Sequence, residues 1–150
     1  YASGCQSPLA PRAATTPGNT WNPPHAVTVR VLTECLGELG LLSGDVDELI
    51  ESGAYTDLYM HRAGHWLGLD VHDVGEYRID GKWRPLEPGM ALTIEPGIYV
   101  ATGNMSVDEK WRGRGVRIED DVVGTEAGCD VLRAGVTQLA EEIDALRDAA

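Results

Sequence analysis

Apolar residues recur at two different periods along the chain, and they predict helices first and strands afterwards. A stripe with steps of three and four residues predicts a helix that starts at about residue 26 and ends near Gly44; its members are Val31, Leu32, Cys35, Leu36, Leu39 and Leu42. Asp45 and Glu48 have the spacing of a capping box, which predicts a second, short helix over residues 46–51.

The middle of the chain has the two-residue period of a β-strand. Residues 67–72 and 115–123 alternate apolar and polar side chains, and residues 90–94 follow a Glu-Pro-Gly turn. Residues 98–100 continue as extended chain after a Pro-Gly turn. An amphipathic helix is predicted at the C-terminal end from Leu139, Ala140, Ile143 and Leu146. Helices, then strands, then a helix predict an α+β fold.

The beginning of the chain has a different character. Residues 4–25 are rich in Pro, Ala, Thr and Gly and show no sustained periodicity. We therefore predict an irregular leader over residues 1–25 and a folded part over residues 26–150. The first residue is Tyr1 rather than Met, which suggests that the sequence was cut from a longer one.

Composition and charge narrow the function classes. The 150 residues are 43% hydrophobic and 24% charged, typical of one globular domain. A net charge of −12 disfavours nucleic-acid binding, because an acidic surface repels phosphate groups. No apolar run approaches the roughly 18 residues that cross a bilayer, and no secretory signal is visible. Cys5, Cys35 and Cys129 are odd in number and widely spaced, which predicts no disulfide framework and a reducing, cytoplasmic setting.

Histidines and carboxylates provide the candidate chemistry. His61, His65 and His72 lie within twelve residues, Glu95 ends a predicted strand, and Glu119 lies inside another. A carboxylate on a half-buried strand is costly unless a cation or hydrogen-bond donors compensate it. One imidazole and two carboxylates form a ligand set suited to manganese, cobalt or zinc.

Structural roles explain the same residues equally well from spacing alone. A single histidine near a strand is more often hydrogen-bonded than bound to a metal. Arg117 and Glu119 share a strand face, so Arg117 could orient a Glu119 ligand or simply pair with it. The acidic run of residues 119–121 could also be a solvated face.

Three ordered blocks of sequence favour the metal site. They are MHRAGHWLGLDVHDVGEY at residues 60–77, LEPGMALTIEPGIYV at residues 86–100 and GVRIEDDVVGTEAG at residues 115–128. This set resembles the C-terminal signature of the Xaa-Pro aminopeptidases, within a wider family that includes prolidase, methionine aminopeptidase and creatinase. A weaker likeness extends over residues 26–150. The sequence HWLGLDVHDVG at residues 65–75 favours aminopeptidase P over prolidase.

The resemblance implies the C-terminal part of a pita-bread (creatinase/aminopeptidase) fold, with a curved antiparallel sheet flanked by helices. Members of the family hold two divalent metals, usually manganese, with two Asp, one His and two Glu. Carried over, His65 matches the imidazole ligand, Glu95 the first glutamate, and Glu119 the glutamate that bridges both metals. The implied activity is release of the N-terminal residue from peptides that have proline in second position.

The remaining site residues are also implied by the resemblance. His61 and His72 match the histidines that line the substrate site, and one of them helps to hold the scissile carbonyl. Tyr99 and Arg117 match positions around the proline pocket and the metal centre. The implied catalytic set is therefore His61, His72, Glu95 and Arg117, with hydroxide as the nucleophile and Glu95 as a proton carrier.

One part of the family pattern is absent. The second aspartate ligand commonly follows a Tyr-Ala-x tripeptide, but Tyr1-Ala2-Ser3 is followed by Gly4, and the first aspartate would precede Tyr1. We therefore expect at most one metal and little activity from the chain alone. Three interpretations remain open: an impaired enzyme, of the aminopeptidase or the prolidase type; a non-catalytic peptide-binding relative; and an inactive relic. A peptide partner is expected, and a homo-oligomer is possible.

Overall fold

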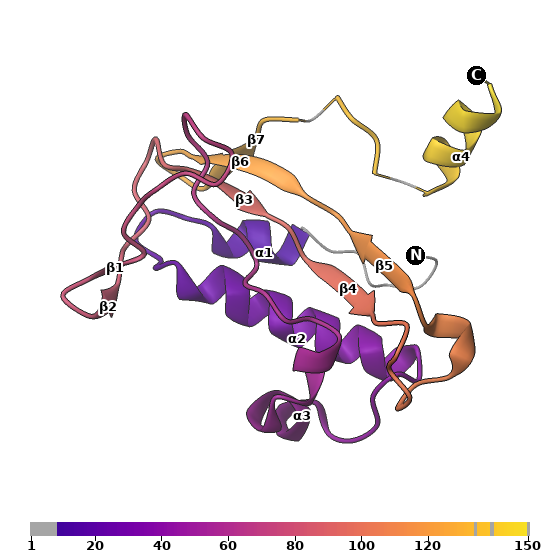
Figure 1. Ribbon diagram of the computed structural model, residues 1–150. Helices are drawn as coiled ribbons and strands as arrows, with labels where there is room; N and C mark the ends of the chain where they lie inside the picture. Colours follow the sequence, from indigo (N-terminus) through magenta and orange to yellow (C-terminus); the bar gives the residue numbers. More distant parts are fainter. Residues whose placement is uncertain (1–8, 134, 139, 150) are drawn as a thin grey trace.

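The computed structural model describes residues 9–133, 135–138 and 140–149. Two helices, α1 (Leu9–Ala14) and α2 (Asn22–Glu38), lie along one face of a set of antiparallel strands (Figure 1). A short helix, α3 (Val46–Ser52), and a helical turn, η1 (Ala54–Asp57), follow, and α4 (Ala140–Asp148) stands away from the strands. The α+β class is confirmed.

Local sequence explains where the helices begin and end. Helix α2 starts with Asn22-Pro23-Pro24, before the predicted start, because the fixed φ of proline suits a first helical turn. Its buried face is Pro24, Thr28, Val29, Leu32, Thr33, Cys35 and Leu36. Helix α3 is capped as predicted: the Asp45 side chain accepts hydrogen bonds from the amides of Asp47 and Glu48.

The predicted irregular leader is irregular only in part. Residues 9–14, LAPRAA, form α1, which packs against α2. Alanine is a strong helix former, and the pattern was too short to reveal a period. The structure of residues 1–8, which include Gly4, lies outside the described residues, as does Leu139 of the predicted C-terminal helix.

Four strands form one long, interrupted antiparallel ribbon. Strand β3 (Ala91–Ile94) pairs with β6 (Asp120–Gly124), and β4 (Gly97–Val100) pairs with β5 (Arg114–Arg117). The two pairs share a single register, since Ile94 faces Asp120 and Gly97 faces Arg117. The strand predicted over residues 115–123 is therefore correct in direction but broken at residues 118–119, opposite Pro96, which has no amide hydrogen to donate.

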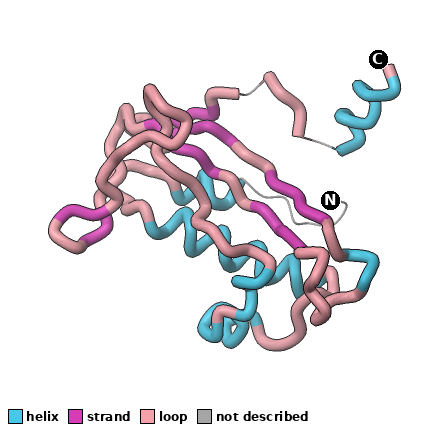
Figure 2. The backbone as a smooth tube through the Cα atoms, viewed as in Figure 1, coloured by secondary structure: helices cyan, strands magenta, loops and turns pink. Residues whose placement is uncertain are grey.

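The strand predicted over residues 67–72 is wrong. The pairing segment is instead residues 63–67, which run antiparallel to β3: the amides of Leu67, Thr93 and Glu95 donate to the carbonyls of Ala91, His65 and Ala63 at 3.1, 2.9 and 2.7 Å. Between residue 58 and β3, the only regular structure is a short hairpin (Figure 2). The alternation of apolar and polar residues over 67–72 suggested a half-buried strand, but Leu69 and Val71 are exposed rather than inward-facing.

Three short strands were not predicted. The hairpin consists of β1 (Arg78–Ile79) and β2 (Lys82–Trp83), joined by Asp80-Gly81 with φ of 50° and 76°. Two consecutive positive φ angles are typical of the tight hairpin turn that Asp-Gly favours, so this dipeptide was an available signal. Strand β7 (Cys129–Val131) pairs with β6 at the sheet edge. A second helical turn, η2 (Glu109–Trp111), precedes β5.

The core lies between the helices and the ribbon. One cluster gathers Trp21, Trp66, Leu86, Leu92, Ile94 and Val122, and a second gathers Leu36, Leu58, Val100 and Val107. Among the described residues, no helix is both long and apolar enough to span a membrane. Cys35 is disulfide-bonded and Cys129 is a free thiol, so the expectation of no disulfide is wrong for Cys35. The cytoplasmic setting stays a prediction.

Candidate metal centre

Two carboxylates face each other where the ribbon is interrupted. Because the register is continuous on both sides, Glu95 of one long strand lies opposite Glu119 of the other. Glu95 is only 7% exposed. Like charges directly across a strand pair are destabilising, and burial makes them more so. The fold itself therefore places two carboxylates where a cation would stabilise both.

His65 approaches the same point from the segment beside β3. Its Nδ1 lies 2.8 Å from the carbonyl oxygen of Trp66, which can only accept, so Nδ1 carries the hydrogen. In the neutral ring, Nε2 then presents its lone pair toward Glu95 Oε1, 3.3 Å away. Two acceptors at this distance need a proton or a cation between them. A carbonyl that fixes the ring in this way is typical of metal-binding histidines.

The three predicted ligands fit a single ion. One ligand atom from each of His65, Glu95 and Glu119 lies within 4.8 Å of the other two. Atoms bound to one ion at about 2.0–2.2 Å are at most about 4.4 Å apart, so side-chain shifts of a few tenths of an ångström are sufficient. One imidazole and two carboxylates suit divalent manganese or zinc. The convergence that the sequence predicted is therefore present.

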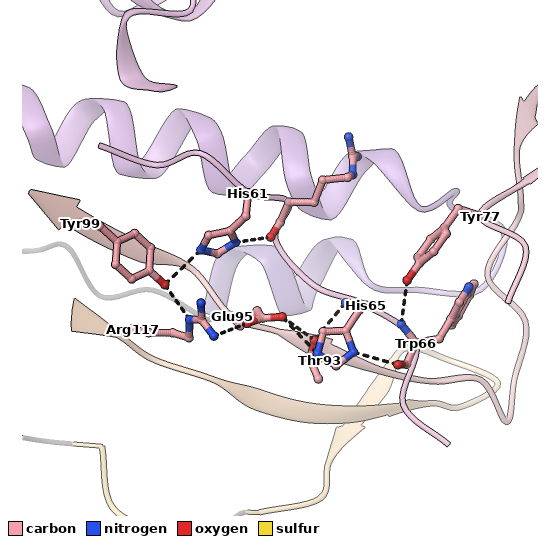
Figure 3. A network of polar contacts seen from close by, with 9 residues as sticks. His61, His65, Trp66, Tyr77, Thr93, Glu95, Tyr99 and Arg117 are labelled. Atoms are coloured by element: carbon pink, nitrogen blue, oxygen red, sulfur yellow. Dashed lines mark hydrogen bonds and ion pairs between the residues drawn. The ribbon is translucent and has the colours of Figure 1, made fainter. Parts of the chain in front are cut away.

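Arg117 holds Glu95 rather than Glu119. Its Nη1 lies 2.9 Å from Glu95 Oε2, and its Nε donates to the Tyr99 hydroxyl at 2.7 Å (Figure 3). The hydrogen bond to Tyr99, followed by the nearby charges of Glu95 and Glu119, raises the pKa of the Arg117 guanidinium above its usual value. The two alternatives considered from the sequence both related Arg117 to Glu119, whereas the ion pair in the structure is with Glu95.

His61 joins the same network through Tyr99. Its Nδ1 lies 2.7 Å from the Arg62 carbonyl oxygen and its Nε2 lies 3.1 Å from the Tyr99 hydroxyl. The carbonyl requires a hydrogen on Nδ1, so in the neutral ring Nε2 accepts from Tyr99 while Tyr99 accepts from Arg117. Both ring nitrogens of His61 are thus engaged within the protein, and Figure 3 shows the chain of contacts from His61 through Tyr99 and Arg117 to Glu95.

His72 lies on the solvent side of the site. Its ring packs edge-on against the His65 ring, with centroids 4.3 Å apart. The side chain is exposed. It is therefore the histidine of the predicted set that is best placed to meet a ligand arriving from solvent. All seven predicted site residues lie in one connected neighbourhood.

Thr93 and Gly64 support the ligands and were not predicted from the sequence. The buried Thr93 hydroxyl accepts from the His65 amide at 3.0 Å and donates to Glu95 Oε1 at 3.2 Å. The available signal was its position two residues before Glu95, on the same strand face. A Cβ on Gly64 would collide with the Thr93 carbonyl oxygen, so only glycine lets this segment approach β3.

Comparison with known proteins places this arrangement in a family. The model of metallopeptidase family M24 matches residues 9–126, a span that begins inside the predicted leader. The Xaa-Pro aminopeptidase of Escherichia coli is 54% identical over 122 residues, covering 81% of this chain and 27% of that protein. Human Xaa-Pro dipeptidase is 37% identical over 173 residues, covering 97% of this chain and 35% of that protein.

Comparison with solved structures leads to the same family. The structure of Pseudomonas aeruginosa aminopeptidase PepP superposes with a TM-score of 0.90 at 62% identity, covering 94% of this chain and 32% of that chain. Zinc-substituted E. coli aminopeptidase P in complex with product matches with a TM-score of 0.82 at 48% identity, covering 93% of this chain and 31% of that chain. The chain belongs to metallopeptidase family M24, with the pita-bread fold of the aminopeptidase P structures. It spans only 27% to 35% of the length of these curated relatives.

Proposed function

We propose that this chain carries the part of a metal-dependent Xaa-Pro aminopeptidase that supplies one histidine and two glutamates to the metal centre. The observation that supports it is the convergence of His65, Glu95 and Glu119 on one point. The substrate would be a peptide with proline in second position, and the reaction would release its first residue. We propose manganese as the ion, and at most one ion for the three ligands found here.

The bound cation would acidify a water molecule and polarise the scissile carbonyl. The protein prepares that site in two ways. The Trp66 carbonyl keeps the hydrogen of His65 on Nδ1 and leaves Nε2 free as a ligand. Thr93 and Arg117 each bind one oxygen of Glu95 and fix the carboxylate plane. The ligands are thus ordered in advance, which reduces the entropy lost on metal binding.

Substrate recognition is assigned to the exposed end of the network. We propose that His72 donates a hydrogen bond to the carbonyl oxygen of the cleaved bond as negative charge develops there. Tyr99 and Arg117 would form the wall that receives the proline ring. His61 can bind substrate only by giving up Tyr99, so we assign it first to orienting the Tyr99 hydroxyl. Glu95 stays the proposed carrier of a proton to the leaving nitrogen.

A dipeptidase is a second candidate, and the similarity to human Xaa-Pro dipeptidase over 97% of this chain supports it. The two activities share a ligand set and differ in the length of peptide accepted. Comparing Ala-Pro with Ala-Pro-Ala as substrates separates them. Cleavage of the tripeptide supports the aminopeptidase, and cleavage of the dipeptide alone supports the dipeptidase.

The test is a titration of the purified, metal-free chain with Mn²⁺ by calorimetry, beside an assay with Ala-Pro-Ala. We expect one bound Mn²⁺, with binding lost in His65→Ala and weakened, but still measurable, in Glu119→Gln. Glu126→Gln, which removes an exposed carboxylate in the loop after β6, is the matched control and should bind as the unmodified chain does. Mn²⁺ binding that is insensitive to both His65→Ala and Glu119→Gln would contradict the proposal.

A further inference from the structure

Asp120, the residue after Glu119, is a buried carboxylate for which the proposed chemistry has no use. It is only 2% exposed. Arg12 Nη1 and Arg133 Nη2 each lie 3.3 Å from one of its oxygens, and Gln138 Nε2 donates to Oδ1 at 2.8 Å. The contact with Arg12 is an ion pair without hydrogen-bond geometry. The alternative of a solvated acidic face is therefore wrong for Asp120.

The partners of Asp120 come from three separate parts of the chain. Arg12 belongs to α1, Arg133 follows β7, and Gln138 precedes α4. Gln138 also donates to the Glu119 carbonyl oxygen at 3.3 Å, so one amide group binds two successive residues. The backbone at residues 119–120 is thus held from outside the ribbon by charges and hydrogen bonds.

Glu119 needs such support because it lies in the interruption of the ribbon. Strand β5 ends at Arg117 and β6 begins at Asp120, so no assigned strand includes Glu119. By contrast, Glu95 is fixed by Thr93 and Arg117, and His65 by Thr93 and the Trp66 carbonyl. The Glu119 backbone is instead held by the Gln138 amide and through its neighbour Asp120.

We propose that Asp120 is a positioning residue for the metal centre: its carboxylate, held by Arg12, Arg133 and Gln138, fixes the backbone so that Glu119 reaches the ion bound by His65 and Glu95. This inference rests on the proposed metal site and adds a role for residues 12, 133 and 138. It also gives α1 a function, because Arg12 links that helix to the site. Supporting residues of this kind commonly change metal affinity by about 10- to 100-fold.

A purely stabilising role for Asp120 makes a different prediction. Asp120→Asn would then lower the free energy of unfolding and leave the Mn²⁺ affinity of the folded chain unchanged. A simple charge effect differs again: two uncompensated arginines would repel any cation nearby, whether or not Glu119 is a ligand. A double-mutant cycle between Asp120 and Glu119 separates positioning from this charge effect.

The experiment measures the Mn²⁺ dissociation constant of the full chain by calorimetry for Asp120→Asn, Glu119→Gln and the double variant. Folding of each is checked by circular dichroism. We expect Asp120→Asn to weaken binding about tenfold in the unmodified background and less than twofold in the Glu119→Gln background. Asp130→Asn, an exposed aspartate on β7, is the matched control and should change binding less than twofold.

Two outcomes overturn the inference: a change of less than twofold in Asp120→Asn, or the same tenfold loss with and without Glu119. If Asp120→Asn does not fold, Gln138→Ala replaces it, because this variant keeps the charge of Asp120 and removes the amide from both residues. At least threefold weaker binding is then expected, and unchanged binding refutes the inference. Absence of any His65-dependent binding in the unmodified chain would instead defeat the proposed metal site itself, and with it the role of Asp120.

Discussion

Replacing Gly64 by alanine tests how the ligand segment is held against β3. The added Cβ would lie closer to the Thr93 carbonyl oxygen than real Cβ atoms come, and the obstacle is backbone rather than a flexible side chain. Gly64 also sits between two backbone hydrogen bonds, Glu95 to Ala63 at 2.7 Å and Thr93 to His65 at 2.9 Å. The segment must therefore move away from the strand, and His65 must move with it.

The size of the effect follows from these contacts. Overpacking a tight site costs about 1–3 kcal/mol, and weakening two backbone hydrogen bonds costs about 1 kcal/mol each. We expect the free energy of unfolding, measured with urea in the presence of a chelator, to fall by about 3–5 kcal/mol. Mn²⁺ affinity should fall as well, because the His65 ring is displaced.

Gly37→Ala is the matched control. Gly37 lies in α2, and a Cβ added there would meet open space, so alanine should leave stability unchanged or raise it by about 0.5–1 kcal/mol. A Gly64→Ala protein as stable as the unmodified chain, with the same Mn²⁺ affinity, would refute the packing argument.

Three further changes give separate tests. Thr93→Val leaves the partly buried His65 amide without its acceptor, and the free energy of unfolding in urea should fall by about 1–3 kcal/mol. An unchanged unfolding midpoint contradicts this prediction. In Arg117→Lys, the lysine cannot bind Glu95 and Tyr99 at the same time, so the Mn²⁺ affinity measured by calorimetry should fall about tenfold. Unchanged affinity would show that the simultaneous contacts with Glu95 and Tyr99 are not needed for metal binding. Burial, with smaller contributions from Arg62 and His61, lowers the pKa of His25 from 6.5 to about 4. The unfolded chain therefore binds a proton in this range that the folded chain does not, so stability should fall as pH drops from about 6.5 to about 4, and His25→Gln should flatten that part of the profile.

The elements with strong local signals were predictable. The Asp45 cap fixed the start of α3, and the alternation in residues 115–123 gave the long strand opposite β3 and β4. The pairing of residues 63–67 was not predictable from local pattern, because it depends on Gly64 fitting against a distant strand. In the loop that follows, the exposed residues Leu69 and Val71 imitated a strand period.

The site was predictable as a set of residues but not in its connections. The family resemblance identified His65, Glu95 and Glu119, and the structure brings them together. The partners of each ligand depend on tertiary geometry. Arg117 forms its ion pair with Glu95, and Asp120 is buried between Arg12 of α1 and Arg133 after β7. A run of three acidic residues gives no local sign of which one faces inward.

A crystal structure of the chain grown with Mn²⁺, with the ion located by its anomalous scattering, probes the proposed site independently of activity. We predict one peak between His65 Nε2 and carboxylate oxygens of Glu95 and Glu119, at about 2.0–2.3 Å from each. A peak elsewhere, or a well-ordered His65–Glu95 pair with no ion at saturating Mn²⁺, would contradict the shared site.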